Sequence, residues 1–278
     1  MGELQTYAKE QDAGFNAPMD LASMALRPAA ADLVSTFFAS FAGGYADAMG
    51  FLVAGSFTGH ITGNLVLLVT SAASGHISRI PKPLVAIVSF LFATVLGIIT
   101  QRSSMRGLKG AVLFFQCLLI GALGLGAVRL SPWFGWALVV AYALCLGLQN
   151  GYTGVADGVA VHPSYMSGTA TRLAKALVLL TGHDEDRNDA RSGITAIISS
   201  TVLAGFIAGA LSAVVAQRAS ASYAPTLLCI PLVLAALASR RQAQKTQSLH
   251  PRITTTARQE NSNDVQPPPG RHARLDRP

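Results

Sequence analysis

The chain has 278 residues, of which 51% are hydrophobic and 13% are charged, and its formal net charge is +7. A soluble domain of this size carries about a quarter charged residues, so the composition excludes an ordinary soluble globular protein. The positive charge does not indicate a nucleic-acid partner, because eight of the 21 Lys and Arg residues lie from Arg240 onward and no recognition motif accompanies them.

Taken in chain order, the sequence alternates between apolar runs and short polar links. Residues 1–32 form a polar arm without the basic and then apolar pattern of a signal peptide. Apolar runs in the first half span about 33–57, 84–100 and 111–128, with a short apolar piece at 65–73. The second half has runs at about 133–156, 193–216 and 223–239, with an amphipathic piece at 167–181. Residues 241–278 are polar and basic, and we expect a disordered tail there.

These runs predict an all-α integral membrane protein, because each reaches or approaches the roughly 20 residues that cross a bilayer. We expect about six transmembrane helices within residues 33–240, arranged as two three-helix repeats, 33–130 and 131–240. The nine residues of the short piece at 65–73 cover only about 14 Å of helix, half of a hydrocarbon core of ~30 Å. The short pieces therefore favour re-entrant hinges, inverted halves and two cytoplasmic termini, and eight spans in parallel halves are the alternative.

The first polar hinge is the segment His60-Ile61-Thr62-Gly63-Asn64, preceded by Asp47 within an apolar run. A carboxylate near the bilayer centre costs about 2.5–3.5 kcal/mol on insertion scales, so Asp47 needs compensation. It either binds a coupling proton or a cation, or makes a helix-packing hydrogen bond. His60 is a candidate proton relay or an interfacial residue. Thr62, Gly63 and Asn64 are candidate solute contacts.

The second polar hinge contains Ser167, Gly168 and Thr169, and each hinge is centred on a glycine. Tyr45 precedes Gly63 by eighteen residues and Tyr152 precedes Gly168 by sixteen, which indicates an internal duplication. Gln149 and Asn150 lie at the deep end of the preceding run. Arg172 either attracts or gates charge near the site, or turns to lipid phosphates. The candidate binding residues here are Gln149, Asn150, Ser167, Gly168, Thr169 and Arg172.

Other chemistry has no sequence support. Cys117, Cys145 and Cys229 are widely spaced in apolar runs, which is typical of buried free thiols and not of a disulfide framework. No pattern of metal ligands, nucleotide-binding loop or catalytic nucleophile occurs in a suitable setting. We therefore expect no enzyme, no cofactor and no metal.

Two long motifs resemble a known family. The first is Gly44-Tyr45-Ala46-Asp47-Ala48-Met49-Gly50-Phe51-Leu52 followed by His60-Ile61-Thr62-Gly63-Asn64. The second is Gly147-Leu148-Gln149-Asn150 with Tyr165-Met166-Ser167-Gly168-Thr169-Ala170-Thr171-Arg172-Leu173. Over about residues 33–240 the chain resembles the YoaK-like bacterial membrane family, a family of unknown function. The resemblance implies about six spans in the bacterial inner membrane and carries no substrate with it.

The duplicated polar hinges favour a secondary transporter or channel-like permease for a small polar solute, with proton coupling through Asp47 as one option. The alternative is a non-transporting membrane assembly or sensor protein whose hinges serve helix packing. The expected partners are the lipid bilayer and the solute, in a multi-pass inner-membrane protein. The oligomeric state stays open, and a homo-oligomer is compatible with the sequence.

Overall fold

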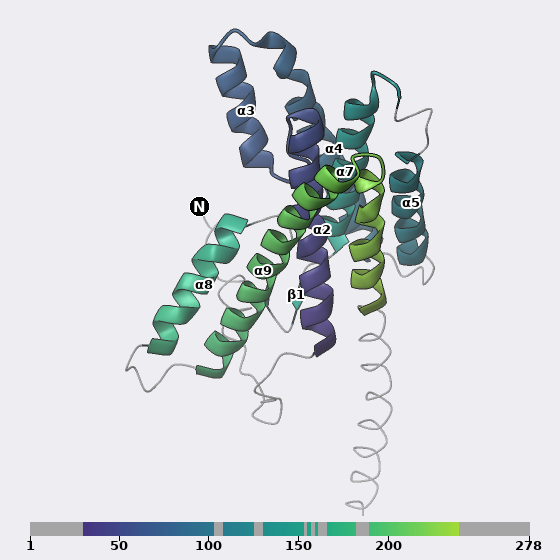
Figure 1. Ribbon diagram of the computed structural model, residues 1–278. Helices are drawn as coiled ribbons and strands as arrows, with labels where there is room; N and C mark the ends of the chain where they lie inside the picture. The colour runs from purple at the N-terminus through teal and green to yellow at the C-terminus, as the bar shows by residue number, and fades with distance from the viewer. Residues whose placement is uncertain are drawn as a thin grey trace, which may run out of the picture.

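The computed structural model describes residues 30–102, 108–124, 130–152, 155–156, 159–160, 166–181 and 189–238. The expected arm up to residue 29 and the expected tail from residue 239 lie outside these residues. Apart from the links, the described chain consists of helices and one hairpin of two-residue strands, β1 (Val155–Ala156) and β2 (Val159–Ala160) (Figure 1).

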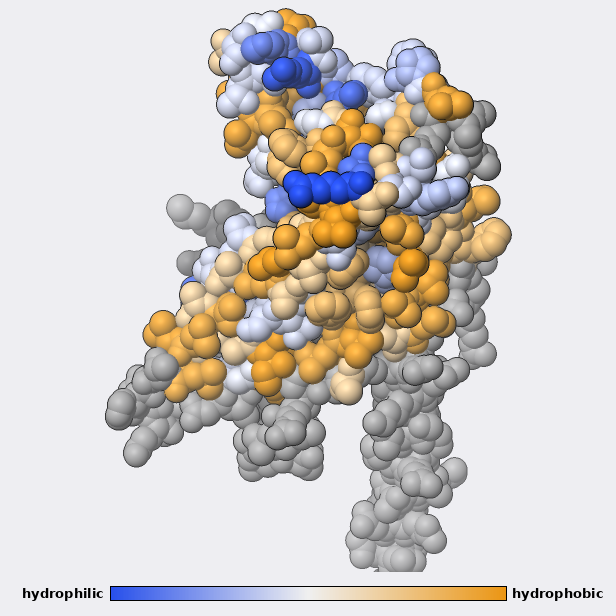
Figure 2. All heavy atoms as spheres, viewed as in Figure 1, coloured by the Kyte–Doolittle hydropathy of each residue, from blue (hydrophilic) through white to orange (hydrophobic). Residues whose placement is uncertain are grey.

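Within the described residues, four helices are long and apolar enough to cross a membrane: α2 (Ala30–Ala54), α4 (Pro81–Arg102), α7 (Phe134–Tyr152) and α9 (Asp189–Ala219). Shorter helices are α3 (Ile61–Ala73), α5 (Leu108–Ala122), α8 (Met166–Thr181), and a C-terminal segment that starts with η3 (Ala224–Leu228) and is helical to residue 238. Large apolar side chains are exposed on the outer faces of these helices, and Figure 2 shows them over the sides of the molecule. This distribution fits contact with lipid.

The long helices pack as two parallel pairs, α2 with α9 and α4 with α7. At each crossing a Cβ added to a glycine of one helix would overlap a backbone carbonyl of the other, so the backbones touch. At the α2–α9 crossing the added Cβ atoms of Gly205 and Gly209 would meet the carbonyls of Phe37 and Phe41, and at the α4–α7 crossing those of Gly147 and Gly151 would meet the carbonyls of Phe90 and Thr94. In both crossings the contacts advance by four residues along both helices, so the paired helices run in the same direction. The two crossings therefore have the same construction.

The start of α7 lies beside the end of α2. A Cβ at Gly135 would lie 3.7 Å from the Cβ of Ala54 and 3.9 Å from the Val53 carbonyl oxygen. Both helices belong to one core, so α2 and α7 run in opposite directions. Because α4 is parallel to α7, and α9 is parallel to α2, the chain reverses direction between α2 and α4 and again between α7 and α9.

Between α2 and α4 the chain folds back into the molecule. Helix α2 ends directly before Gly55, which has a φ of 70°, a backbone angle that is accessible to glycine and strained for other residues. The following link runs down along the last two turns of α2, since a Cβ at Gly50 would lie 2.6 Å from the methyl group of Thr58. Helix α3 therefore begins beside Asp47, about 10 Å before the end of α2 at 1.5 Å per residue. Figure 1 shows α3 leading away from this point to the link that starts α4.

The core lies where α2, α7, α5 and the C-terminal segment meet, around Met49, Tyr142 and Leu228. Two buried tyrosines fix the C-terminal segment: Tyr45 of α2 donates its hydroxyl to the Ala224 carbonyl, and Tyr142 of α7 donates to the Pro225 carbonyl, both at 2.5 Å. All three cysteines are free thiols; Cys145 is buried in this core as expected, whereas Cys117 and Cys229 are half-buried.

Candidate functional site

Asp47 organises the first hinge. Its Oδ1 accepts the backbone N–H of Thr58 at 2.8 Å, the N–H of Gly59 at 2.6 Å and the hydroxyl of Thr58 at 3.3 Å. The side chain is 3% exposed, so these bonds supply the compensation that a buried carboxylate needs. The carboxylate holds a broken stretch of backbone at its own depth in the helix bundle.

His60 binds the second oxygen of the same carboxylate. Its Nδ1 lies 2.6 Å from Asp47 Oδ2, and the imidazole packs against the rings of Phe57 and of Phe206 on α9. His60 lies in the link outside the candidate spans, and the hydrogen bond to Asp47 raises the pKa of its imidazole, although burial acts in the opposite direction. With 28% of its side chain exposed, His60 is the part of this pair that can exchange protons with its surroundings.

Asn64 is committed to the hinge itself. Its amide nitrogen donates to the Phe57 carbonyl at 2.8 Å, and its Oδ1 accepts the Phe57 N–H at 3.0 Å and the Ser56 hydroxyl at 3.2 Å. Gly63 lies against the Phe57 ring, where an added Cβ would be 2.9 Å from Cδ2. Thr62 is exposed at the start of α3. Of these three predicted contacts, Thr62 is therefore the side chain best placed to meet a solute.

The second hinge begins helix α8. Thr169 is fully buried and accepts a hydrogen bond from Nη2 of Arg172 at 3.1 Å. Ser167 is exposed, Gly168 is half-buried, and the Ser167 carbonyl accepts the hydroxyl of Thr171 at 3.0 Å. The guanidinium thus bonds a hydroxyl of its own helix one turn earlier. The sequence also offers Asp157 as a carboxylate partner for Arg172, and that residue lies outside the described residues.

The remaining predicted residues, Gln149 and Asn150, belong to the last turn of α7. Gln149 is 2% exposed, and the side-chain oxygen of the half-buried Asn150 has no hydrogen-bond partner among the described residues. Both amides lie at the same end of α7 as the glycine crossing with α4. The Asn150 side-chain oxygen is therefore an acceptor open to a solute in this region.

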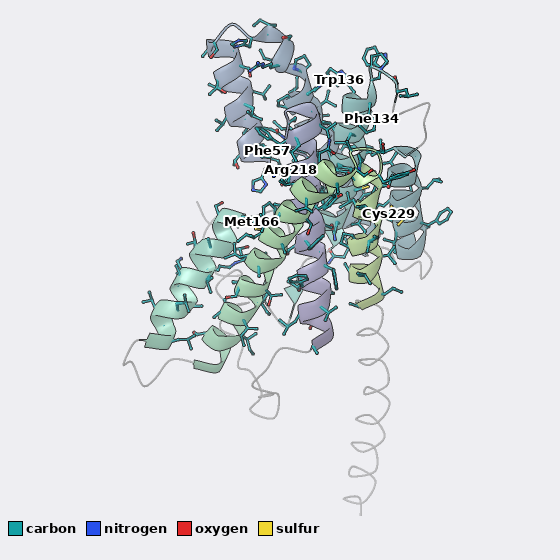
Figure 3. The ribbon with its side chains drawn as sticks, in the orientation of Figure 1. Phe57, Phe134, Trp136, Met166, Arg218 and Cys229 are labelled. Carbon is teal, nitrogen blue, oxygen red and sulfur yellow. The ribbon has the colours of Figure 1, made fainter. Side chains whose placement is uncertain are left out.

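Both hinges meet helix α9 within about two turns of each other. His60 makes an edge-on ring contact with Phe206, at 5.6 Å between centroids, and Met166, the first residue of α8, packs against the cluster of Ile198 and Val202. Figure 3 shows Phe57, beside the start of α3, and Met166 approaching the same stretch of α9. Since α3 and α8 both start here, their free N–H groups and positive dipole ends are directed to one region.

The sequence did not indicate two contacts, one at the hinges and one elsewhere in the helix bundle. Phe206 contacts His60 from 146 positions away, and nothing in an apolar run distinguishes the residue that faces a partner. Gln116 is fully buried on α5, where its amide donates to the Cys145 carbonyl at 3.0 Å. A glutamine inside an apolar run is the signal that identifies it. Among the described residues, no group of three His, Cys, Asp or Glu side chains is arranged to hold a metal ion.

Helix length, apolar exposure and buried polar hinges define a protein built for a lipid bilayer. Residues 35–238 match the family described as "Protein of unknown function (DUF1275)", and the chain belongs to that family. No curated protein and no solved structure matches the chain. The match covers the predicted membrane domain and both hinges, and agrees with the family of unknown function that the two motifs indicated.

Proposed function

We propose that this protein is a secondary transporter, or a channel-like permease, for a small polar solute in the bacterial inner membrane. The observation that carries the proposal is the meeting of two broken-helix ends on α9, at the depth where Asp47 binds the non-helical backbone of Thr58 and Gly59. Transporters built from repeats bind their solutes at such breaks, where unwound backbone lines a site instead of facing lipid.

Helix directions support six spans. A full crossing by α3 would make α2 and α4 parallel, and a full crossing by α8 would make α7 and α9 parallel. Both pairs are antiparallel, so each short helix enters and leaves on one side. The spans are then α2, α4, α5, α7, α9 and the C-terminal helix. The matching glycine crossings support two inverted halves, in which α2, α3 and α4 correspond to α7, α8 and α9.

Each candidate residue then has a role. The Asp47–His60 pair couples transport to protons, because it is the described ion pair in this region and spans the break. Asn64 and Gly63 shape the first hinge. Thr62, with the exposed Ser167, offers hydroxyl contacts to the solute. The second-half residues Gln149, Asn150, Gly168, Thr169 and Arg172 line the opposite side. The solute is neutral, zwitterionic or anionic, since hydroxyls, amides and helix starts suit all three.

A specific observation favours the alternative function, a non-transporting assembly or sensor protein. Every polar atom of Asp47 and Asn64 is already bonded within the hinge, as helix packing alone would require. Neither function includes catalysis.

Flux into proteoliposomes separates the two functions. A panel of sugars, amino acids and small organic and inorganic anions is tested with the purified full chain, with and without a pH gradient. We expect Thr62→Val to reduce flux of the transported solute, while Thr70→Val, on the same helix but hydrogen-bonded to the carbonyl of Val66, leaves flux unchanged. Loss of pH-dependent flux in Asp47→Asn is the expected sign of coupling. No flux for any solute, with a stable and folded protein, favours the alternative.

A further inference from the structure

Helix α2 carries a buried polar face that continues from Asp47 of the hinge toward the N-terminal end of the helix. Asp32, Thr36, Ser40 and Asp47 follow one another at spacings of four, four and seven residues, which places them on one side of the helix. Their exposed fractions are 3%, 4%, 0% and 3%. From Asp32 to Asp47 the face rises by 15 residue steps, about 22 Å of helix, from the first turn of α2 to the Asp47–His60 pair.

The opposite face of α2 has a different composition. Ala42, Tyr45, Ala46 and Met49 belong to the hydrophobic core, and Tyr45 is the polar exception with its hydroxyl bonded to the Ala224 carbonyl. A helix that only packs against apolar neighbours does not need buried hydroxyls and carboxyls in register along its other side.

Ser40 shows that this polar face is incompletely paired by protein. Its hydroxyl oxygen is buried without a hydrogen-bond partner in the described structure. The threonine hydroxyls of Thr94, Thr100 and Thr201, in comparison, each donate to the carbonyl one turn earlier at 2.8 Å. Ser40 lies at the crossing with α9, where Gly205 has no side chain to offer and an added Cβ would lie 3.3 Å from Ser40 Cβ. A buried hydroxyl of this kind is normally satisfied by water or a ligand.

We propose that this polar face of α2 is a hydrated route for protons between the N-terminal end of α2 and the Asp47–His60 pair. The inference rests on the proposed function, for which it supplies the path of the coupling ion. Hydroxyls of Thr36 and Ser40 both donate and accept, so a proton passes along water and hydroxyl groups by exchange of hydrogen bonds and no other bond forms or breaks. It binds Asp47 or His60 at the end of the route.

Other charged or titratable groups belong to the helices around α2. They include Asp189, Arg191 and Arg218 on α9, Tyr142, Cys145 and Tyr152 on α7, and Arg172 and Lys175 on α8. Arg218 lies in the last turn of α9 and Asp189 is its first residue, while the hydroxyl of Tyr142 is bonded to the Pro225 carbonyl. The carboxyls of Asp32 and Asp47 and the imidazole of His60 are therefore the groups on the route itself.

The test is water access along α2 in the full chain, in membranes. Single cysteines replace Thr36, Ser40 or Ala42 in a background in which the three native cysteines are changed to alanine. Ala42→Cys is the matched control, since Ala42 is fully buried at the same depth on the opposite face. The probe is a small cationic methanethiosulfonate, which reacts with thiolate and so requires a hydrated thiol.

We expect Thr36→Cys and Ser40→Cys to react at least about tenfold faster than Ala42→Cys, since each unit by which water lowers a thiol pKa gives tenfold more thiolate. The faster reaction should occur with reagent on the side of the α2 N-terminus. Equal rates at all three positions would overturn the route. If only the proton route is wrong, the three labelling rates are equal and solute flux is still observed. If the proposed transport function is wrong, no solute flux is observed, and the labelling rates still differ as expected.

A second measurement follows protons directly. After an acid jump on proteoliposomes, protonation of Asp47 is followed by its carboxyl infrared band, identified by its loss in Asp47→Asn. Ser40→Ala should slow protonation several-fold relative to wild type. An unchanged rate, together with fast thiol labelling, would overturn the proton assignment and leave a hydrated route without this relay.

Discussion

The carboxylate of Asp47 is predicted to hold the first hinge in place. In Asp47→Ala the N–H groups of Thr58 and Gly59 lose their acceptor, and His60 loses its partner. A buried polar group left unsatisfied costs about 1–3 kcal/mol, so two such N–H groups cost about 2–6 kcal/mol. Asp47→Asn keeps an acceptor oxygen and loses the charge, and should cost about 1–2 kcal/mol, since hydrogen bonds to charged groups exceed neutral ones by about this amount.

Hydrogen exchange measures this loss at the hinge itself. A local cost of about 2 kcal/mol raises the population of the open link about 30-fold, so the amide protons of Thr58 and Gly59 should exchange at least about 30-fold faster in Asp47→Ala than in wild type. Amides in the middle of α4 serve as the internal control. Unchanged protection of residues 58 and 59 in a folded Asp47→Ala protein would refute the reasoning, because the carboxylate would then carry no part of the hinge.

Three further predictions concern stability. Asn64→Ala should destabilise the protein by about 1–3 kcal/mol in chemical denaturation by releasing the backbone of the first hinge, whereas a near-neutral result would contradict the role assigned to its amide. Gly209→Ala should destabilise the protein by about 1–3 kcal/mol, because the Cβ of the new alanine would overlap the α2 backbone. Gly193→Ala is the control on the same helix; it has open space around it and should be neutral or stabilising by up to about 1 kcal/mol. Since the pKa of His60 is raised in the folded protein, its stabilising effect should be complete below about pH 6.5 and disappear as pH rises through the higher folded value. Denaturation of wild type and His60→Phe at a series of pH values should show this difference shrinking with rising pH, and a constant difference would contradict it.

The positions of the helices and the membrane-protein class could be predicted from the sequence, because long apolar runs are the direct consequence of contact with lipid. The run expected at about 33–57 is α2 (Ala30–Ala54), and the run at about 84–100 is α4 (Pro81–Arg102). The observed helix ends differ from the ends of the apolar runs by a few residues, because a helix can include polar residues at its ends. Lys82, for example, lies in the first turn of α4, and its ammonium is 5.9 Å from the centre of the Trp136 ring. The helical membrane class and the family are confirmed, while the repeats and the solute site stay predictions.

The interior of the hinge could not be predicted, because its hydrogen bonds form only after the chain has folded back. Asn64 and Asp47 were expected as solute contacts from their polarity in an apolar setting, yet both bond the link at 56–60. The sequence does not specify the reversal at Gly55, since several glycines nearby are equally able to adopt a positive φ. The contact between His60 and Phe206 depends on how α9 crosses α2, which backbone contact at Gly44 determines.

The most direct test of inverted halves around re-entrant hinges is the sidedness of the ends of α4. Single cysteines at Ser78, before α4, and at Gln101, at its end, are exposed positions that can be labelled in the cysteine-free background. In intact cells an impermeant thiol reagent should label Ser78→Cys and spare Gln101→Cys until the membrane is opened. Labelling of Gln101→Cys with protection of Ser78→Cys would mean that α3 crosses the membrane, and would contradict the inverted, re-entrant arrangement on which the proposed transport site depends.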